Sequence, residues 1–433
     1  MLGGERETSR LELMNLDVTA DVTLPRLTSS VRTRDRFATT ALAALVLASL
    51  ASAVTATGAL VADDAGVTPK AYHAMLIAAG LAMLFRGSIP RPRTELVLYF
   101  GVTLSATLLA YLAHEPRMGA IKLLIAMYVA LVAAAIGRVA HPRIVLRACR
   151  VASVVFLVIV TAKNAQHAPA FVLYLANPFG HPDVPTLAAG GLNLEATWLA
   201  LSSVFMIGTA LFVPFALMAA ATSALYATRA GIVIVVLAAC VALAHAWGAR
   251  RAAQHGSDSP YRLTRHGRRI LAFGLALVAI GAFGAATVAV RKVGDATYVA
   301  QRFATIGEEP GSLGRITLWR GGMAVFAENP LGVGIGNAVP ALKRTLGVDV
   351  IEDNLHNIYL QHAVETGLPG LIALIVFGVM IARRVIRSRF QDHLLLFVAG
   401  YLVAGLIQFT GVDAMLWLAY GLQSGSTAGA VDG

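Results

Sequence analysis

Long stretches without a charged side chain recur along this 433-residue chain and limit what it can fold into. Most approach or exceed the roughly 20 residues that a helix needs to cross the hydrocarbon core of a membrane. With 57% hydrophobic and 14% charged residues, the chain has too few polar side chains to cover a water-soluble surface. We therefore expect an all-α integral membrane protein. The stretches are Phe37–Ala62, Leu96–Ala113, Ala196–Thr228, Ala230–Ala249, Ile270–Val290, Thr366–Ala382, Leu394–Val412 and Ala414–Val431, with shorter ones at Ala71–Phe85 and Leu123–Gly137. A further, mainly apolar run at roughly Ile144–Ala162 can also cross if its flanking residues snorkel.

Arginine clusters between the apolar stretches predict the orientation of the spans, because cytoplasmic loops of membrane proteins carry an excess of lysine and arginine. If Ala196–Thr228 formed one helix, the basic segment from Arg250 to Arg269 would lie outside, against this rule. Two helices broken near Pro214, where proline removes a backbone donor, put that segment inside. The pattern then predicts about twelve spans with both termini in the cytoplasm.

This topology divides the chain into five parts. The outer loop among them is too long to be a bare connector, and loops of that length are usually functional. The parts are a cytoplasmic segment over residues 1–36, transmembrane helices 1 to 9 over residues 37–290, the outer loop over residues 291–366, transmembrane helices 10 to 12 over residues 367–428 and a tail over residues 429–433.

Two segments of the outer loop have helical patterns. Arg315–Ala327 carries Ile316, Trp319, Met323 and Phe326 at helical spacing, which predicts an amphipathic helix along the membrane interface. The second helix is expected at Asn354–Glu365 and ends at Gly367, just before Pro369. A shorter outer segment, Lys163–Asn193, contains four prolines and is expected to be irregular.

Arginines also gather on the predicted outer side. Arg229 stands between two apolar stretches, where a charge is costly unless it faces a polar cavity or an anion. Arginine stays charged and offers planar bidentate hydrogen bonds, which suits a diphosphate. The alternatives are a snorkelling anchor for Arg229 and solvated loop charges for the others. Those others are Arg291, Arg302, Arg315 and Arg320.

His356 is the candidate for acid–base chemistry. An imidazole group titrates near neutral pH and can take a proton from a sugar hydroxyl; a purely structural histidine is the alternative. His362 lies six residues further on, roughly on the opposite helix face, which argues against a paired metal site. Asp413 starts the last apolar stretch and either orients an arginine or acts only as a helix N-terminal carboxylate.

No motif in the sequence predicts a nucleotide, a metal ion or another cofactor. The glycine-rich segment Gly332–Gly336 lacks the spacing of a dinucleotide-binding loop and predicts a tight turn after Pro330. The adjacent Asp63 and Asp64 predict a hydrated turn. The net charge of +11 mostly reflects the cytoplasmic anchors, so no nucleic acid partner is expected.

Five short segments together carry a family resemblance. They resemble the O-antigen ligase family of the Wzy_C type, membrane glycosyltransferases that move a glycan off a polyprenyl diphosphate lipid. The resemblance covers roughly Thr228 to Trp417, and Thr228 stands where the family often has serine. The segments are Ala227–Gly231, Gly314–Trp319, Asn329–Asn337, His356–Gln361 and Glu365–Gly367.

The resemblance implies a GT-C-like fold in the bacterial inner membrane, with residues 291–366 as a catalytic loop in the periplasm. It further implies a metal-independent, inverting transfer of O-antigen from undecaprenyl diphosphate to lipid A-core. His356 would deprotonate the acceptor hydroxyl. The donor diphosphate would be held by Arg229, Arg315, Arg291 and Arg320, with support from Asp413, Asn357 and Trp319.

Three other functions remain open. An O-antigen polymerase or a protein O-oligosaccharyltransferase would share the donor and much of the motif, but the short tail after Trp417 favours a ligase. A transporter would show repeat symmetry and charged or broken helices at mid-bilayer, whereas the charges here lie at helix mouths. The identity of the glycan, the acceptor sugar and the oligomeric state do not follow from the sequence.

Overall fold

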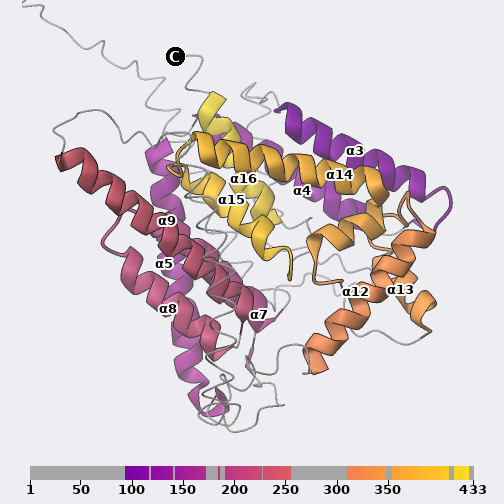
Figure 1. Cartoon of the computed structure of the whole chain (residues 1–433), viewed down its shortest axis with the longest axis horizontal. Coiled ribbons are helices and arrows are strands. Elements are labelled where there is room, and N and C mark those ends of the chain that lie inside the picture. The colour runs from indigo at the N-terminus through magenta and orange to yellow at the C-terminus, as the bar shows by residue number, and fades with distance from the viewer. Residues whose placement is uncertain are drawn as a thin grey trace, which may run out of the picture.

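All regular secondary structure in the described part of the chain is helical (Figure 1), as the composition predicts. The helices form one bundle, with α12 and α13 beside one end of α14. The computed structural model describes residues 93–116, 119–139, 142–171, 184–185, 191–226, 228–254, 310–347, 354–408 and 414–428.

Four of the described helices are long and apolar enough to cross a membrane. They are α4 (Gly119–Val139), α5 (Pro142–Gln166), α9 (Arg229–Gln254) and α14 (Ile358–Arg387). Shorter apolar helices are α3 (Thr94–Ala110), α8 (Phe212–Leu225) and α15 (His393–Ala404), and α16 covers Ala414–Ala428. The expected spans Phe37–Ala62, Ala71–Phe85 and Ile270–Val290 lie outside the described residues, so about twelve spans remains a prediction.

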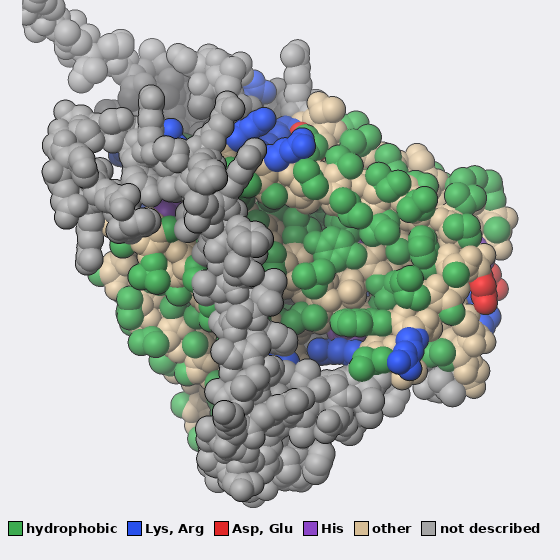
Figure 2. All heavy atoms as spheres, in the orientation of Figure 1, with side chains coloured by type: hydrophobic (Ala, Val, Ile, Leu, Met, Phe, Trp, Pro, Cys, Tyr) green, Lys and Arg blue, Asp and Glu red, His purple; other side chains and the backbone are tan. Residues whose placement is uncertain are grey.

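The outer surface of the bundle suits a lipid environment. Figure 2 shows a broad expanse of hydrophobic side chains over the described helices, with Lys and Arg near its margins. Leu108 of α3 is 57% exposed and Ile372 of α14 is 50% exposed. Large apolar side chains in such numbers on an outer face are stable in lipid but not in water.

Close packing of small residues joins α4 and α16. A Cβ atom on Gly421 would come within 2.4 Å of the Ala130 carbonyl oxygen, and one on Gly137 within 2.3 Å of the Leu422 oxygen. Glycine therefore lets the two backbones touch, as is common between membrane helices. Next to them the rings of Tyr99, Phe377 and Trp417 pack together and are fully buried.

The stretch Ala196–Thr228 is broken into two helices, as expected, but not at Pro214. Helix α7 (Leu192–Ser202) and a 3-10 turn precede a break over residues 207–211, and α8 follows. Gly208, with φ of 78°, lies in that break. Pro214 instead occupies the first turn of α8, where proline's missing N–H has no helical partner to lose.

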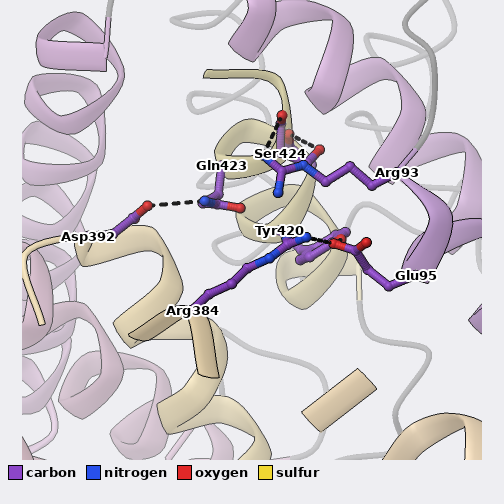
Figure 3. A network of polar contacts seen from close by, with 8 residues as sticks. Arg93, Glu95, Arg384, Asp392, Tyr420, Gln423 and Ser424 are labelled. Carbon is purple, nitrogen blue, oxygen red and sulfur yellow. Dashed lines mark hydrogen bonds and ion pairs between the residues drawn. The ribbon is translucent and has the colours of Figure 1, made fainter. Parts of the chain in front are cut away.

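The start of α3 meets the end of α14 at one end of the bundle, which we call the Arg384 end (Figure 3). Arg384 forms an ion pair with Glu95, which also accepts a hydrogen bond from the Tyr420 hydroxyl at 2.8 Å. Arg93 donates to the carbonyl oxygen of Ser424 at 3.3 Å. Because α3 and α14 meet here by opposite termini, they run in opposite directions.

The opposite end, which we call the His356 end, brings together the start of α14 and the end of α15. There the Ile358 N–H donates to the Gly405 carbonyl oxygen at 2.7 Å. Nearby, the Thr197 hydroxyl in the middle of α7 (Leu192–Ser202) donates to Gln408 Oε1 at 2.7 Å, whereas the Ile207 carbonyl oxygen beyond α7 lies 3.1 Å from His393 Nε2 at the start of α15. The start of α7 therefore points towards the His356 end.

Candidate functional site

His356 lies in a turn directly before α14 and has an unusual backbone. Its φ of 50° lies in the left-handed region, which few residues other than glycine adopt. The His356 N–H donates to Asn354 Oδ1 at 2.7 Å, and this bond closes the turn. Strained backbone of this kind is frequent at functional sites.

Asn357 fixes the start of α14 immediately after this histidine. Its side-chain oxygen accepts the N–H groups of Tyr359 and Leu360, each at 3.0 Å. This is helix N-capping, which satisfies donors that have no partner inside the helix. Asn357 therefore fixes the start of the helix that follows His356, and its supporting role in a reaction stays a prediction.

Helix α12 (Pro310–Glu328) contacts the turn before His356 through Trp319. The indole Nε1 donates to the Leu355 carbonyl oxygen at 2.8 Å. Arg315 lies four residues before Trp319, so both occupy one face of the helix. The half-buried Arg315 and the half-buried His356 thus belong to segments that touch, although they are 41 residues apart in sequence (356 − 315).

Helix α12 packs apolar side chains against a small core beside its exposed stripe. Leu318 and Val325 are buried in this core with α13 (Ala338–Leu346) and α14, and Trp319 and Phe326 are partly buried against it, whereas Met323 is 56% exposed. An orientation of this helix along the membrane interface stays a prediction. Ile316, Trp319, Arg320 and Met323 line a shallow hollow on the outer side of the helix.

The two predicted arginines of α12 face different directions. Five residues separate Arg315 from Arg320, which places them about 140° apart around a helix of 3.6 residues per turn. Arg320 is exposed beside Met323, while Arg315 follows the face of Trp319. The geometry therefore favours Arg315 over Arg320 as the arginine next to the His356 turn.

The glycine-rich segment Asn329–Asn337 lies against a kink in α14 at Gly367. The Val333 N–H donates to the Val364 carbonyl oxygen at 2.9 Å, and the Gly334 N–H donates to the Glu365 oxygen at 2.8 Å. A phosphate-binding loop would need such N–H groups for its ligand. These are already used, so the segment is a packing turn, as the spacing predicts.

Glycine at the kink also lets the backbone of the glycine-rich segment approach the backbone of α14 more closely than any side chain would allow. Gly367 has φ of 66°, and a Cβ on it would lie 2.3 Å from the Leu331 carbonyl carbon. The helix predicted to end at Gly367 does so, although a second helical stretch continues directly to Arg387. Pro369 sits in the first turn of that stretch, where its ring is tolerated.

Arg229 begins α9 at the His356 end. The preceding Thr228 hydroxyl donates to Asn193 Oδ1 at 2.9 Å, which ties the start of α9 to the start of α7. A Cβ on Gly231 would lie 2.3 Å from Ser223 Oγ, so α8 and α9 pack too closely there for a side chain. A serine at position 228 could donate the same hydrogen bond, so threonine leaves this contact intact.

A buried polar cluster near Arg229 escaped the sequence analysis. Lys163 Nζ lies 2.5 Å from Glu195 Oε1, with side chains only 7% and 0% exposed. The Tyr226 hydroxyl lies 2.9 Å from the same carboxylate oxygen and 2.5 Å from Asn164 Oδ1. Lys163 lies in the last turn of α5 and not, as expected, at the start of an irregular outer segment.

The signal for this cluster was present in the sequence. Lys163 and Glu195 are single charges beside long apolar stretches, and charges in such places are usually paired or functional. Their separation of 32 residues gave no reason to pair them. Only the packing of α5, α7 and α8 makes them neighbours.

We expect Glu195→Leu to lower the thermal midpoint of the purified protein in detergent. Removing one partner of a buried ion pair leaves an uncompensated charge and costs about 3–5 kcal/mol. The double variant Lys163→Met/Glu195→Leu should recover most of the loss. Tyr226→Phe is the matched control, because it keeps the ion pair and removes a hydrogen bond worth about 1 kcal/mol. An unchanged midpoint for Glu195→Leu would contradict the pairing.

Other predicted site residues fall outside the described part of the chain. These are Arg291 and Asp413, together with Arg302, so their places in the site remain predictions. Within the described ranges, no three or more His, Cys, Asp or Glu side chains are grouped as a metal ion would require. The expected independence from metal ions is a statement about the reaction and stays a prediction.

The comparison with known families supports the motifs. Residues 213–375 match the family model described as O-antigen ligase. This segment is similar to the O-antigen ligases. It is less than half of the chain, but it includes Arg229, Arg315 and His356 together with the glycine-rich segment. No curated protein matches the chain.

The structure relates the three main candidates within the matched segment as follows. Arg229 and His356 come from the same end of the bundle, and Arg315 comes from the helix that bonds to the His356 turn. The arrangement offers two guanidinium groups and one imidazole from three separate segments.

Proposed function

We propose that this protein transfers O-antigen polysaccharide from undecaprenyl diphosphate to lipid A-core. The observation that carries the proposal is the left-handed turn at His356, bonded to α12 one helical turn from Arg315. Both lie in the segment that matches the O-antigen ligases. Donor and acceptor are lipids, which suits a site at the end of apolar helices.

In this proposal the His356 end faces the periplasm and the protein resides in the bacterial inner membrane. The support is the basic residues at the other end, since Arg143 starts α5 there and Arg384 ends α14. Labelling of His356→Cys by a membrane-impermeant thiol reagent, after Cys149 and Cys240 have been replaced, tests the orientation. Labelling only from the cytoplasm would refute it.

The proposed reaction is a single displacement at the anomeric carbon of the glycan. His356 takes the proton of the acceptor hydroxyl, and the oxygen forms a bond to the anomeric carbon. The bond from that carbon to the diphosphate oxygen breaks, and its electron pair leaves with undecaprenyl diphosphate. Because attack and departure occur on opposite faces, the configuration inverts.

Arg229 and Arg315 neutralise the charge that develops on the departing diphosphate. Guanidinium groups held in place before the reaction can take the role that a divalent ion has in other transferases. Arg320 and Arg291 are assigned as further diphosphate contacts. Asn357 and Trp319 hold the turn of His356, and Asp413 is assigned a supporting role.

We expect purified protein to transfer the glycan from a lipid-linked donor to lipid A-core in excess EDTA. The donor already carries a good leaving group, and the arginines supply the positive charge. Product formation is followed by gel mobility of the acceptor, with donor or acceptor omitted as controls. Activity that EDTA abolishes and Mg²⁺ or Mn²⁺ restores would refute metal independence, whereas no transfer under any condition would refute the function.

A further inference from the structure

A chain of hydrogen bonds runs from the glycine-rich segment to the residue before His356. The Gly336 N–H donates to Glu365 Oε1 at 3.0 Å, and Gln361 Nε2 donates to the same oxygen at 2.7 Å. Gln361 Oε1 in turn accepts the Leu355 N–H at 2.9 Å. Gln361 and Glu365 are each 5% exposed and Leu355 is fully buried.

The chemistry of the partners fixes how Gln361 is oriented. A carboxylate only accepts hydrogen bonds and a backbone N–H only donates, so the amide nitrogen must face Glu365 and the amide oxygen must face Leu355. Turning the amide over would leave both bonds unmade. Gln361 therefore couples the position of the Glu365 carboxylate to that of the Leu355 backbone.

Gln361 acts on the backbone of Leu355, the residue directly before His356. The Leu355 N–H is held by Gln361, and its carbonyl oxygen accepts the bond from Trp319. The residue before His356 is thus held on one side by α14 and on the other by α12. A left-handed backbone persists only where the surroundings over-determine it, and these two bonds do so.

The far end of the chain is anchored as well. The glycine-rich segment is fixed by the Tyr111 hydroxyl, which donates to the Ile335 carbonyl oxygen at 2.5 Å. Asn337 Nδ2 donates to the Glu115 carbonyl oxygen at 2.8 Å. Gly336, which donates to Glu365, therefore stands on a segment tied to the connection after α3.

We propose that Gln361 and Glu365 are positioning residues that set the place of His356 for proton transfer. Two buried polar side chains would be costly in an apolar helix if their only task were to fill space. Their hydrogen bonds lead instead to the turn of the catalytic histidine. The inference rests on the proposed function, in which His356 is the base.

Transfer rates in a double-mutant cycle test the proposal. Gln361→Leu removes both hydrogen bonds and keeps a side chain of similar size. It should lower the rate about 100-fold, the scale of a 1 Å misplacement of a reacting group, while donor binding stays unchanged. In a His356→Ala background the same substitution should have no further effect. Tyr359→Phe is the matched control, because it removes a bond to the Leu402 oxygen at 3.0 Å from the same helical turn.

A second variant covers the case in which Gln361→Leu does not fold. Glu365→Gln keeps an oxygen that can accept from Gly336 and Gln361, but the bonds lose their charge assistance. Its rate should fall less than that of Gln361→Leu, and its effect should also vanish in the His356→Ala background. Losses that add to that of His356→Ala would overturn the proposal, because the residues would then act elsewhere.

Hydrogen–deuterium exchange separates this proposal from the proposed function. The amides of residues 354–358 should exchange faster in Gln361→Leu than in the wild-type protein, whatever reaction the protein performs. Unchanged exchange together with a wild-type rate in Gln361→Leu would overturn the positioning role. A wild-type protein that transfers nothing to lipid A-core would instead refute the function, and the exchange result would still show whether Gln361 holds the turn.

Discussion

His356→Ala should lower the rate of glycan transfer by about 10²- to 10⁴-fold, the usual scale for loss of a general base. The acceptor hydroxyl would then keep its proton until late in the attack, so the barrier rises. Donor binding should change little, because the diphosphate is assigned to the arginines. Single-turnover measurements with purified protein and saturating donor report the chemical step directly.

Two variants separate chemistry from structure in this experiment. His356→Asn removes the imidazole but keeps a residue type that tolerates a left-handed backbone, so the turn should persist. It should lose as much activity as His356→Ala. His114→Ala removes a histidine from the connection after α3, also at the His356 end, and should stay near the wild-type rate. A wild-type rate in His356→Asn would remove the catalytic assignment.

Arg229→Ala and Arg315→Ala should each lower the transfer rate by about 10²- to 10³-fold, the range seen when one preorganised donor to a developing charge is lost. Lysine at either position should restore only part, because an ammonium group does not make the planar bidentate contact of a guanidinium. Arg320→Ala should lose less, since Arg320 faces the exposed side of α12.

Donor binding decides between two explanations of a negative result. Tight donor binding in Arg229→Lys and Arg315→Lys with full activity would mean that positive charge alone suffices. Full activity of both alanine variants would mean that neither arginine contacts the diphosphate in the transition state. Thermal midpoints close to that of the wild-type protein are the control for folding.

The apolar stretches, together with glycine and proline residues that interrupt helices, predicted most of the helices and their ends. The ends of α4, α5 and α9 lie within a few residues of the predicted stretches, and the interruption at Gly367 follows from glycine before proline. These features depend on neighbours in sequence, so a single sequence contains them. The break before α8 was predicted near Pro214, but the chain turns at Gly208, whose φ of 78° is open to glycine and was not anticipated.

Contacts between distant segments could not be read in the same way. The Lys163–Glu195 ion pair and the bond from Trp319 to Leu355 each join helices whose relative placement no local pattern specifies. The left-handed backbone at His356 likewise results from bonds with Asn354, α12 and Gln361. Motif resemblance singled out His356, whereas the structure shows which groups hold its turn.

Lipopolysaccharide from a strain that lacks this gene, complemented with the wild-type gene or with His356→Asn, tests the central claim most directly. Gel mobility and mass analysis of the acceptor report whether glycan has been added to the core. We predict full-length O-antigen with the wild-type gene, and with His356→Asn a bare core together with accumulated lipid-linked polymer. A core that carries single repeat units in the deletion strain would contradict the ligase assignment and indicate a polymerase, and normal O-antigen on the core in that strain would contradict both.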